Sequence, residues 1–300
     1  MNVIEIPTLG KRVEYPSCWE ELNREQLLFI MRNSLLLTSG DISMLDFQVL
    51  VLYNLLGIRR KWKHNKRDRN LTQEHFNKKY CNIARAAETV DFMFTRRDGT
   101  LIFDFNCVIN FLPEIRIKRK TFYGPADALF NITFEEYQVA CDYNRRFIAS
   151  REESDLNTLC AVLYRPGRNG DIGNDRREEF NPHLSVKRAE LFKRVHFEVK
   201  YTILSWFSAC DNYLKTGDIE IEGRIVSFAA LFRKETNENE VETDTNLGLT
   251  GIMMAIADNG TFGSLEQVKR TNLYTVMLRV YLWHLENERL KKLYKNDKSE

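Results

Sequence analysis

Residues 133–163, which read TFEEYQVACDYNRRFIASREESDLNTLCAVL, contain two helices together with their boundary signals. Thr133 and Glu136 form a capping-box pattern, in which a hydroxyl group and a glutamate satisfy the free N–H groups of the first helical turn. We predict a helix that begins there and ends at Ala149, and a second helix over residues 153–163. This uninterrupted helical pattern indicates a mainly α fold.

The helical pattern continues toward the C-terminus. Apolar residues recur at helical spacing over residues 183–214 and predict one long helix or two stacked ones, which Gly217 ends. The short apolar stretch 225–232 and the longer stretch 264–294 also predict helices. Residues 126–300 are therefore expected to form an all-helical region.

The N-terminal part of the chain begins with strands. Residues 3–6 and 12–15 alternate between apolar and polar side chains and are separated by a turn, which predicts a β-hairpin. Helical spacing begins at Cys18, where Ser17 and Glu20 offer a capping box.

Two helices and a small sheet are expected next. Residues 43–56 and 72–87 have helical spacing, and two strands flank the turn at residues 97–99. With the extended stretch that follows, these strands predict a three-stranded sheet within residues 90–123.

The fold class predicted from these patterns is mainly α, with a helical bundle-like domain and a small antiparallel β element. The β element comprises the N-terminal hairpin and the strands near residues 90–120. A change in composition near residues 124–132 divides the chain into a mixed helical region with a small sheet, 1–125, and the all-helical region 126–300. One continuous domain is the alternative.

The composition indicates a protein with a large core and little net charge. The 300 residues are 43% hydrophobic and 12% aromatic, and 44 basic residues face 42 acidic ones for a formal charge of +2. Such a balance gives no general attraction to polyanions, so a charge-driven partner requires a local patch.

The cysteines and the N-terminus predict a cytoplasmic protein. The six cysteines include no CxxC pair, and Cys107, Cys141, Cys160 and Cys210 have apolar neighbours, as is typical of buried reduced thiols. The first residues lack the apolar core of a signal peptide, and no apolar run approaches the roughly 20 residues that span a bilayer. We therefore expect no membrane partner.

The sequence contains none of the catalytic, metal-binding or cofactor-binding patterns that we sought. The five histidines, at positions 64, 75, 183, 196 and 284, include no pair at the i, i+4 spacing that presents two ligands on one helix face. Gly167, Gly170 and Gly173 lack the Gly-Lys-Ser/Thr ending of a phosphate-binding loop, and there is no GxSxG nucleophile elbow. We expect a non-enzymatic protein with no catalytic residue, no metal and no cofactor.

The most basic segment, residues 59–69, suggests a nucleic-acid-binding role. Lysine and arginine around an aromatic side chain can contact phosphates while a base stacks on the ring. Arg116 to Lys120 could extend this patch, and the other interpretation is a solvated loop that balances the acidic segment 235–244. The candidate residues are Arg59, Arg60, Lys61, Trp62, Lys63, Lys66 and Arg67.

A second candidate is the charged segment 164–182, YRPGRNGDIGNDRREEFNP, between two predicted helices. Proline ends the preceding helix, and the glycines allow sharp turns. Long charged loops between buried helices often recognise other proteins, although a crossover held by its own salt bridges would have the same pattern. The candidate protein-binding residues are Tyr164, Arg165, Arg168, Arg176, Arg177 and Phe180.

Three stretches carry a resemblance to a known group of proteins. They are PSCWEELNREQLLFI at 16–30, LCAVLYRPG at 159–167 with EEFNPHLSVKRAELF at 178–192, and ADNGTFGSLEQVKRTNLYTVMLRVYLW at 257–283. Together they resemble uncharacterised tail-morphogenesis proteins, similar to tail assembly chaperones, of tailed phages and prophages of Bacteroides-type bacteria. The resemblance implies a protein that binds another phage structural or assembly protein, and it transfers no catalytic residue.

Three functions therefore remain open at the level of sequence. The first is a phage assembly protein that binds another virion or tail protein, which predicts a large exposed apolar patch or a homo-oligomer that hides one. The second is a nucleic-acid-binding protein that uses residues 59–69. The third is a structural connector or tail-completion subunit, which would form rings of fixed stoichiometry.

Overall fold

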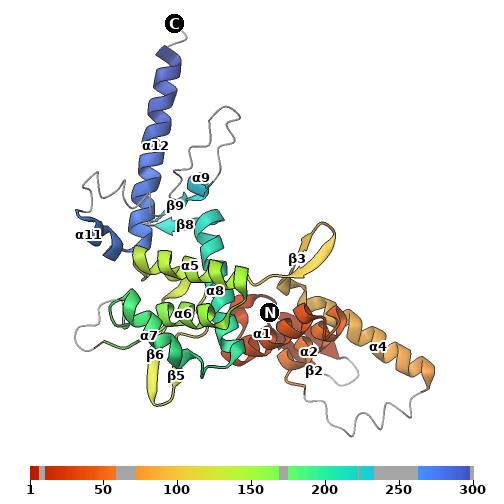
Figure 1. The fold of residues 1–300 in the computed structure, drawn as a ribbon. Helices are drawn as coiled ribbons and strands as arrows, with labels where there is room; N and C mark the ends of the chain where they lie inside the picture. Colours follow the sequence, from red (N-terminus) through yellow and green to blue (C-terminus); the bar gives the residue numbers. More distant parts are fainter. Residues whose placement is uncertain (7–10, 59–71, 169–174, 222, 233–262, 298–300) are drawn as a thin grey trace. The chain divides into compact units, whose positions relative to one another are not determined.

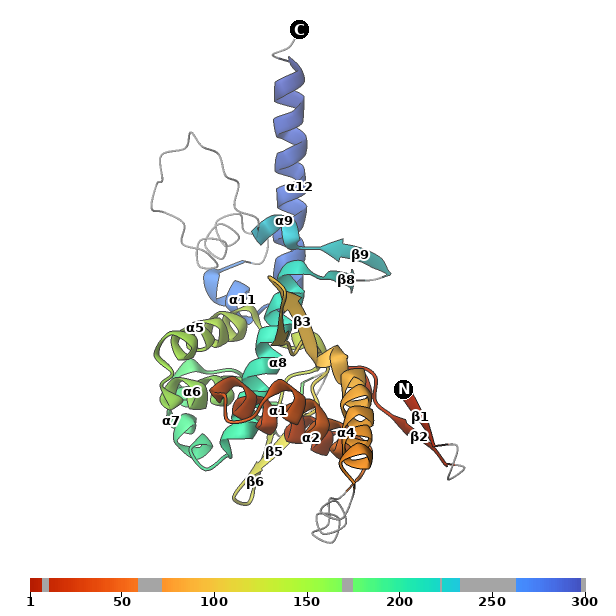
Figure 2. The same cartoon turned by 90° about the vertical axis from the view of Figure 1, so that its right-hand side faces the viewer.

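The computed structural model describes residues 1–6, 11–58, 72–168, 175–221, 223–232 and 263–297 (Figures 1 and 2). Within them the protein is mainly helical with small antiparallel sheets, which confirms the predicted class in its coarser form, although the helices do not make a simple bundle. Contacts divide the chain into two units. The first comprises residues 1–107 and 197–202, and the second comprises residues 108–196 and 203–300.

The helices of the first unit lie where the sequence predicts them, except at the first boundary. They are α1 (Arg24–Ser39), α2 (Met44–Leu55) and α4 (Gln73–Ala87). The predicted capping box of Ser17 and Glu20 is wrong, because the chain first makes a 3-10 turn at Trp19–Glu21. Asn23 then caps α1, and its box partner is Gln26.

The strands of the first unit form two separate hairpins. β1 (Asn2–Ile6) pairs with β2 (Lys11–Tyr15), which confirms the predicted N-terminal hairpin. β3 (Phe94–Arg97) pairs with β4 (Thr100–Phe103) around Asp98 and Gly99, whose φ angles of 49° and 79° are those of a tight hairpin turn.

An aromatic cluster forms part of the core of the first unit. The ring of Trp19 makes edge contacts with Phe92, Phe103 and Phe105, at centroid distances of 5.6, 5.8 and 4.7 Å. Phe47 of α2 contacts Phe103 in the same geometry. The β3–β4 hairpin is thereby joined to the helices of its unit.

The second unit is built around α6 (Glu153–Leu163), which packs against α5 (Phe134–Ser150) and α7 (Pro182–Phe192). Every residue of α6 from Leu156 to Leu163 is buried. α8 (Phe197–Thr216) contributes its residues from Ile203 onward, and α11 (Leu265–Arg270) and α12 (Leu273–Asp297) complete the helices. The predicted helices over 133–149, 153–163 and 183–214 are thus confirmed to within a few residues, the last as two helices.

A three-stranded sheet in the second unit corrects the sheet predicted within residues 90–123. Its order is β5 (Glu114–Ile117), β6 (Lys120–Tyr123) and β7 (Arg165–Pro166), all antiparallel. The strands near residue 100 do not join it, because the chain from Asp104 to Pro113 is not extended into a strand. The third strand comes instead from the segment after α6, with Tyr123 opposite Arg165.

The prediction that residues 126–300 are all helical fails at β7 and again after α8. β8 (Asp218–Ile221) pairs with β9 (Arg224–Ser227), and only the last residues of the predicted helix 225–232 form α9 (Ala229–Phe232). The alternating Ile and Val side chains favour a strand here, with Ile219 buried opposite Val226. Gly223, at φ 75°, allows the tight turn between the strands.

The thiols predicted to be buried lie inside the protein. Cys107, Cys160 and Cys210 are buried and Cys141 is half-buried. Among the described residues, no helix is both long enough and apolar enough to span a membrane.

Candidate functional site

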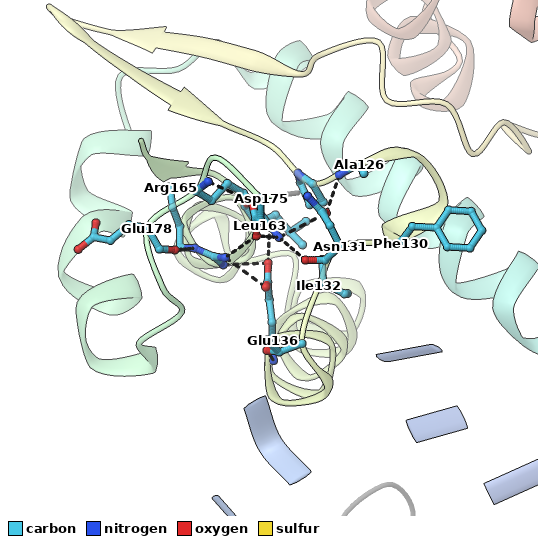
Figure 3. A network of polar contacts seen from close by, with 12 residues as sticks. Ala126, Phe130, Asn131, Ile132, Glu136, Leu163, Arg165, Asp175 and Glu178 are labelled. Carbon is cyan, nitrogen blue, oxygen red and sulfur yellow. Dashed lines mark hydrogen bonds and ion pairs between the residues drawn. The ribbon is translucent and has the colours of Figure 1, made fainter. Parts of the chain in front are cut away.

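A buried cluster of charged side chains lies at the base of the predicted protein-binding segment (Figure 3). Glu136 comes from α5, Arg165 from β7 and Arg177 from the returning chain, and each side chain is at most 2% exposed. One carboxylate oxygen, Oε1 of Glu136, forms an ion pair with Nη1 of Arg165 at 2.8 Å and accepts a hydrogen bond from Nη1 of Arg177. The other, Oε2, accepts from Nη2 of Arg165 at 3.2 Å. Asp175, which is partly exposed, accepts from Arg177 Nη2 at 2.9 Å. These four residues are called the ion network below.

The local sequence explains how Glu136 reaches this position. Thr133 caps α5, because its hydroxyl accepts from the backbone N–H of Glu136 at 3.2 Å, as the sequence predicts. In a complete capping box the glutamate side chain would turn back to the cap residue. Here it points instead to the two arginines, so the network uses a residue that the helix end has positioned.

The backbone brings the two arginines together by folding residues 165–178 into a hairpin. Gly167 bridges to Arg177, and the N–H of Arg168 donates to the carbonyl of Arg176 at 3.0 Å. The N–H of Glu178 donates to the carbonyl of Pro166 at 2.8 Å. Residues 169–174, between the two arms, lie outside the described residues.

Both guanidinium groups also cap the C-terminal end of α6. Arg165 Nη1 donates to the carbonyl of Val162 at 2.9 Å, and Arg177 Nη1 donates to that of Leu163 at 3.1 Å. These carbonyls belong to the last helical turn, where no helical N–H follows to satisfy them and the helix dipole favours positive charge. The network therefore connects the start of α5 to the end of α6.

The remaining donors of both arginines are satisfied as well. Arg165 Nε donates to the carbonyl of Glu178 at 2.7 Å, and Arg177 Nη2 donates to the carbonyl of Asn131 at 3.1 Å. Arg177 Nε donates to Asp175 Oδ1 at 2.9 Å. Since each guanidinium nitrogen already has a protein acceptor, the network holds backbone segments in place and does not offer an anion-binding site.

The charges of the network balance, with two guanidinium groups against two carboxylates. Burial lowers the pKa of Arg165, and the attraction of Glu136 only partly offsets this effect. Burial acts in the same direction on Arg177, but Glu136 and Asp175 outweigh it and raise the pKa of Arg177. Both arginines remain charged at neutral pH, because their ordinary pKa lies far above it.

The structure gathers the six predicted protein-binding residues around this hairpin, but their exposure differs. Tyr164 is buried, and its hydroxyl donates to the carbonyl of Leu112 at 2.8 Å. Arg168 and Phe180 are half-buried, and Phe180 lies under the guanidinium of Arg165 at 5.6 Å. Arg176 is exposed. Three of the six side chains, Tyr164, Arg165 and Arg177, therefore stabilise the hairpin from inside and are not available on the surface.

A small surface pocket of about 380 Å³ lies beside the ion network. Its lining includes Tyr123, Asn131, Asp175 and Arg176, so it offers charges of both signs. Gly124 also lines it, and a Cβ atom there would lie 2.6 Å from the ring of Tyr164. The close approach of this backbone to the buried tyrosine requires glycine.

The predicted nucleic-acid-binding residues divide into two groups. Arg59, Arg60, Lys61, Trp62, Lys63, Lys66 and Arg67 lie outside the described residues. The proposed extension is described, and it forms the exposed end of the β5–β6 hairpin. Its side chains, all exposed, are Arg116, Lys118, Arg119 and Lys120.

No family model, curated protein or solved structure matches this chain. Within the residues that the structure describes, no group of three or more His, Cys, Asp or Glu side chains is arranged to hold a metal ion. The hairpin and the surfaces around it are therefore the features from which a function can be proposed.

Two members of the ion network, Glu136 and Asp175, are absent from the residues that the sequence predicts for this site. The sequence signal at Glu136 is an acidic residue three positions after Thr133. The capping-box pattern accounts for that signal locally and hides the second role. The partner residues are 29 and 41 positions away along the chain, beyond the reach of any local pattern.

Proposed function

We propose that this chain is a non-enzymatic assembly protein of a tailed phage, which binds another virion or tail protein in the manner of a tail assembly chaperone. The observation that supports the proposal is the ion network, which holds the base of the 165–178 hairpin while Arg176 and Glu179 remain exposed on its returning arm. The resemblance found in the sequence supplies the phage context.

A fixed base suits a recognition element for an energetic reason. Association requires loops to become ordered, and a segment that is already held in one conformation loses less entropy when it binds. Buried ion pairs add little net stability to a fold, because the desolvation of both charges offsets much of their attraction. Their use here fits a role in setting one conformation of the hairpin for a partner.

The experiment is affinity purification of the tagged full-length chain from cells that carry the phage, with and without nuclease, followed by quantitative mass spectrometry. The wild type is compared with the charge swap Arg176→Glu/Glu179→Arg, which leaves the ion network intact. The matched control is the swap Asp142→Arg/Arg145→Glu on the exposed side of α5, where these two residues form an ion pair at 3.2 Å.

We expect one virion or tail protein to co-purify despite nuclease, to be retained by the control and to be depleted at least tenfold by the hairpin swap. Equal recovery by both variants would show that the hairpin is not the contact surface. Recovery of no virion or tail protein would overturn the assembly role itself.

A second candidate function, nucleic-acid binding, is favoured by the basic end of the β5–β6 hairpin. Arg116, Lys118, Arg119 and Lys120 are exposed within five residues, and Lys118 sits in the turn at φ 57°. A hairpin that presents several cations can follow a phosphate backbone.

Binding of a fluorescent single-stranded oligonucleotide over a salt series tests this second function. Lys118→Glu/Arg119→Glu should weaken binding and reduce the slope of log affinity against log salt by roughly 0.7 for each phosphate that the variant no longer neutralises. The control Arg145→Glu/Lys187→Glu, on α5 and α7, makes the same charge change elsewhere in the second unit. Equal effects of the two variants would indicate only nonspecific attraction.

A further inference from the structure

The C-terminal half of α12 presents leucines that the described residues leave exposed. The first turns of the helix are buried through Leu273, Val276 and Met277, and Tyr281 still contacts the ring of Phe228 at 6.0 Å. Beyond that point the helix extends away from the other elements of the second unit (Figures 1 and 2). Leu282, Leu285, Leu290 and Leu293 follow there, with 45–53% of each residue exposed.

These four leucines lie on one side of the helix. At about 100° per residue they fall within an arc of about 140°, and Glu286 and Arg289 lie in the middle of the same arc. The six residues Leu282, Leu285, Glu286, Arg289, Leu290 and Leu293 are called the α12 leucine face below. The other side is polar at its centre, where Glu288 and Lys291 form an ion pair at 3.1 Å, and Trp283 lies at one of its edges.

The α12 leucine face has a palindromic order. Its midpoint falls between Asn287 and Glu288, and the leucines are spaced by three, five and three positions around it. Reversing the helix about that midpoint exchanges Leu282 with Leu293 and Leu285 with Leu290. The same reversal exchanges Glu286 with Arg289, which have opposite charges.

We propose that this face binds a second copy of the same chain, with the two α12 helices antiparallel about a twofold axis at the midpoint. In this arrangement Leu282 lies at the height of Leu293 of the other copy, and Glu286 at the height of Arg289, all near the line along which the helices face each other. Leu285 and Leu290 lie on the two flanks of the interface. A twofold interface requires a surface that is complementary to itself, and this face meets the requirement in the order of its leucines and in its charges.

The charges of Glu286 and Arg289 favour a second copy of the chain as the partner and an antiparallel orientation of the two helices. A parallel pair would place Glu286 opposite Glu286 and Arg289 opposite Arg289, which is unfavourable. Among the described residues none forms an ion pair with Glu286 or Arg289, so both remain available to the second copy. The proposal does not depend on the proposed function, because it concerns a different surface of the second unit.

Sedimentation velocity of the full-length chain over a concentration series tests the proposal. The wild type should show a monomer–dimer equilibrium. Glu286→Arg and Arg289→Glu each place like charges opposite one another, and each should weaken dimerisation at least tenfold. The control Glu288→Arg makes the same charge change on the polar side, and it should dimerise like the wild type.

Mixing the two weakened variants separates pairing between chains from effects within one helix. One chain then carries arginine at both positions and the other carries glutamate at both, so the antiparallel pair regains both ion pairs. We expect the equimolar mixture to form heterodimers with at least the wild-type affinity.

Three results would overturn the proposal. A wild type that stays monomeric would show that the face is covered otherwise, either by the apolar stretch 247–256 of the same chain or by a different protein. Charge-reversed variants that dimerise normally would place the dimer contact elsewhere. Closed rings of more than two copies would favour a connector subunit instead.

Discussion

The base of the 165–178 hairpin and the C-terminal half of α12 distribute polar and apolar groups in opposite ways. At the hairpin base, charged side chains are buried and each guanidinium nitrogen has an acceptor. On α12, leucines are exposed. Both arrangements depart from the usual rule that apolar groups lie inside and charges outside, but among the described residues only the first has all of its partners. The charged groups of the hairpin base have their partners inside the protein, whereas the leucines of α12 are exposed and can contact another molecule.

The largest expected effect comes from removing the shared acceptor of the ion network. Glu136→Gln leaves two buried guanidinium groups without their carboxylate, and breaking a buried pair in this way typically destabilises a protein by about 3–5 kcal/mol. Urea denaturation should show this loss, whereas Glu135→Gln, one residue earlier, removes only a partly exposed ion pair with Lys269 at 3.9 Å and should cost less than about 1 kcal/mol. A loss below about 1 kcal/mol for Glu136→Gln would mean that water reaches the network.

A second buried polar contact in the same unit should have a smaller effect. Tyr137 of α5 is fully buried, and its hydroxyl donates to Asp211 of α8. Burial, together with the neighbouring Cys141 and Asp211, raises the pKa of Tyr137, so the phenol keeps its proton. Tyr137→Phe removes one hydrogen bond to a charged group and should destabilise the protein by about 1.5–3 kcal/mol.

The control for this variant is Tyr143→Phe, on a half-buried residue of the same helix. If both substitutions had equal effects on the denaturation midpoint, the hydrogen bond to Asp211 would contribute nothing beyond the loss of a hydroxyl group.

The packing beside the hairpin base provides a third test. Gly124→Ala would place a Cβ atom 2.6 Å from the ring of Tyr164, and overpacking of this kind costs about 1–3 kcal/mol. Combining it with Tyr164→Leu removes the ring and should make the two substitutions non-additive. Strict additivity in thermal unfolding would show that the backbone at residue 124 moves away freely.

The smallest effect is expected on α12. Leu290→Gln changes an exposed leucine to a polar residue and should alter the stability of the monomer by less than about 0.5 kcal/mol. The measurement is urea denaturation at a protein concentration where the wild type is monomeric. A loss comparable to that of Glu136→Gln would show that the leucine is buried within its own chain.

The sequence predicts the helices of this protein better than its polar contacts. Thr133 marks the start of α5, and the proline after Arg165 marks the end of α6. Both are local signals. Local patterns fail where two nearby residues could each cap a helix equally well. Ser17 and Asn23 are such a pair, and Asn23 caps α1. Local patterns also fail at residues 225–232, because a short apolar run suits a strand and a helix alike.

The sequence predicts where in the chain the candidate site lies, but it does not predict what each of its side chains contacts. The charges of segment 164–182 identify it, and the alternative of a crossover held by its own salt bridges describes Arg165 and Arg177 well. Which arginines face inward depends on Glu136, and its position relative to them is set only by the packing of α5 against α6. A charge pattern alone does not distinguish Arg176, which is exposed, from Arg177, which is buried.

The order of the ion network along the chain has a consequence for synthesis. Ribosomes make Glu136 first, Arg165 next and Arg177 last, so all residues of α5 and α6 are synthesised before their second counter-ion. Until Arg177 arrives, the last carbonyl of α6 lacks its cap, and the Glu136 carboxylate has one of its two cations. The packed pair of α5 and α6 can therefore acquire its full set of buried ion pairs only after residue 177 has been synthesised.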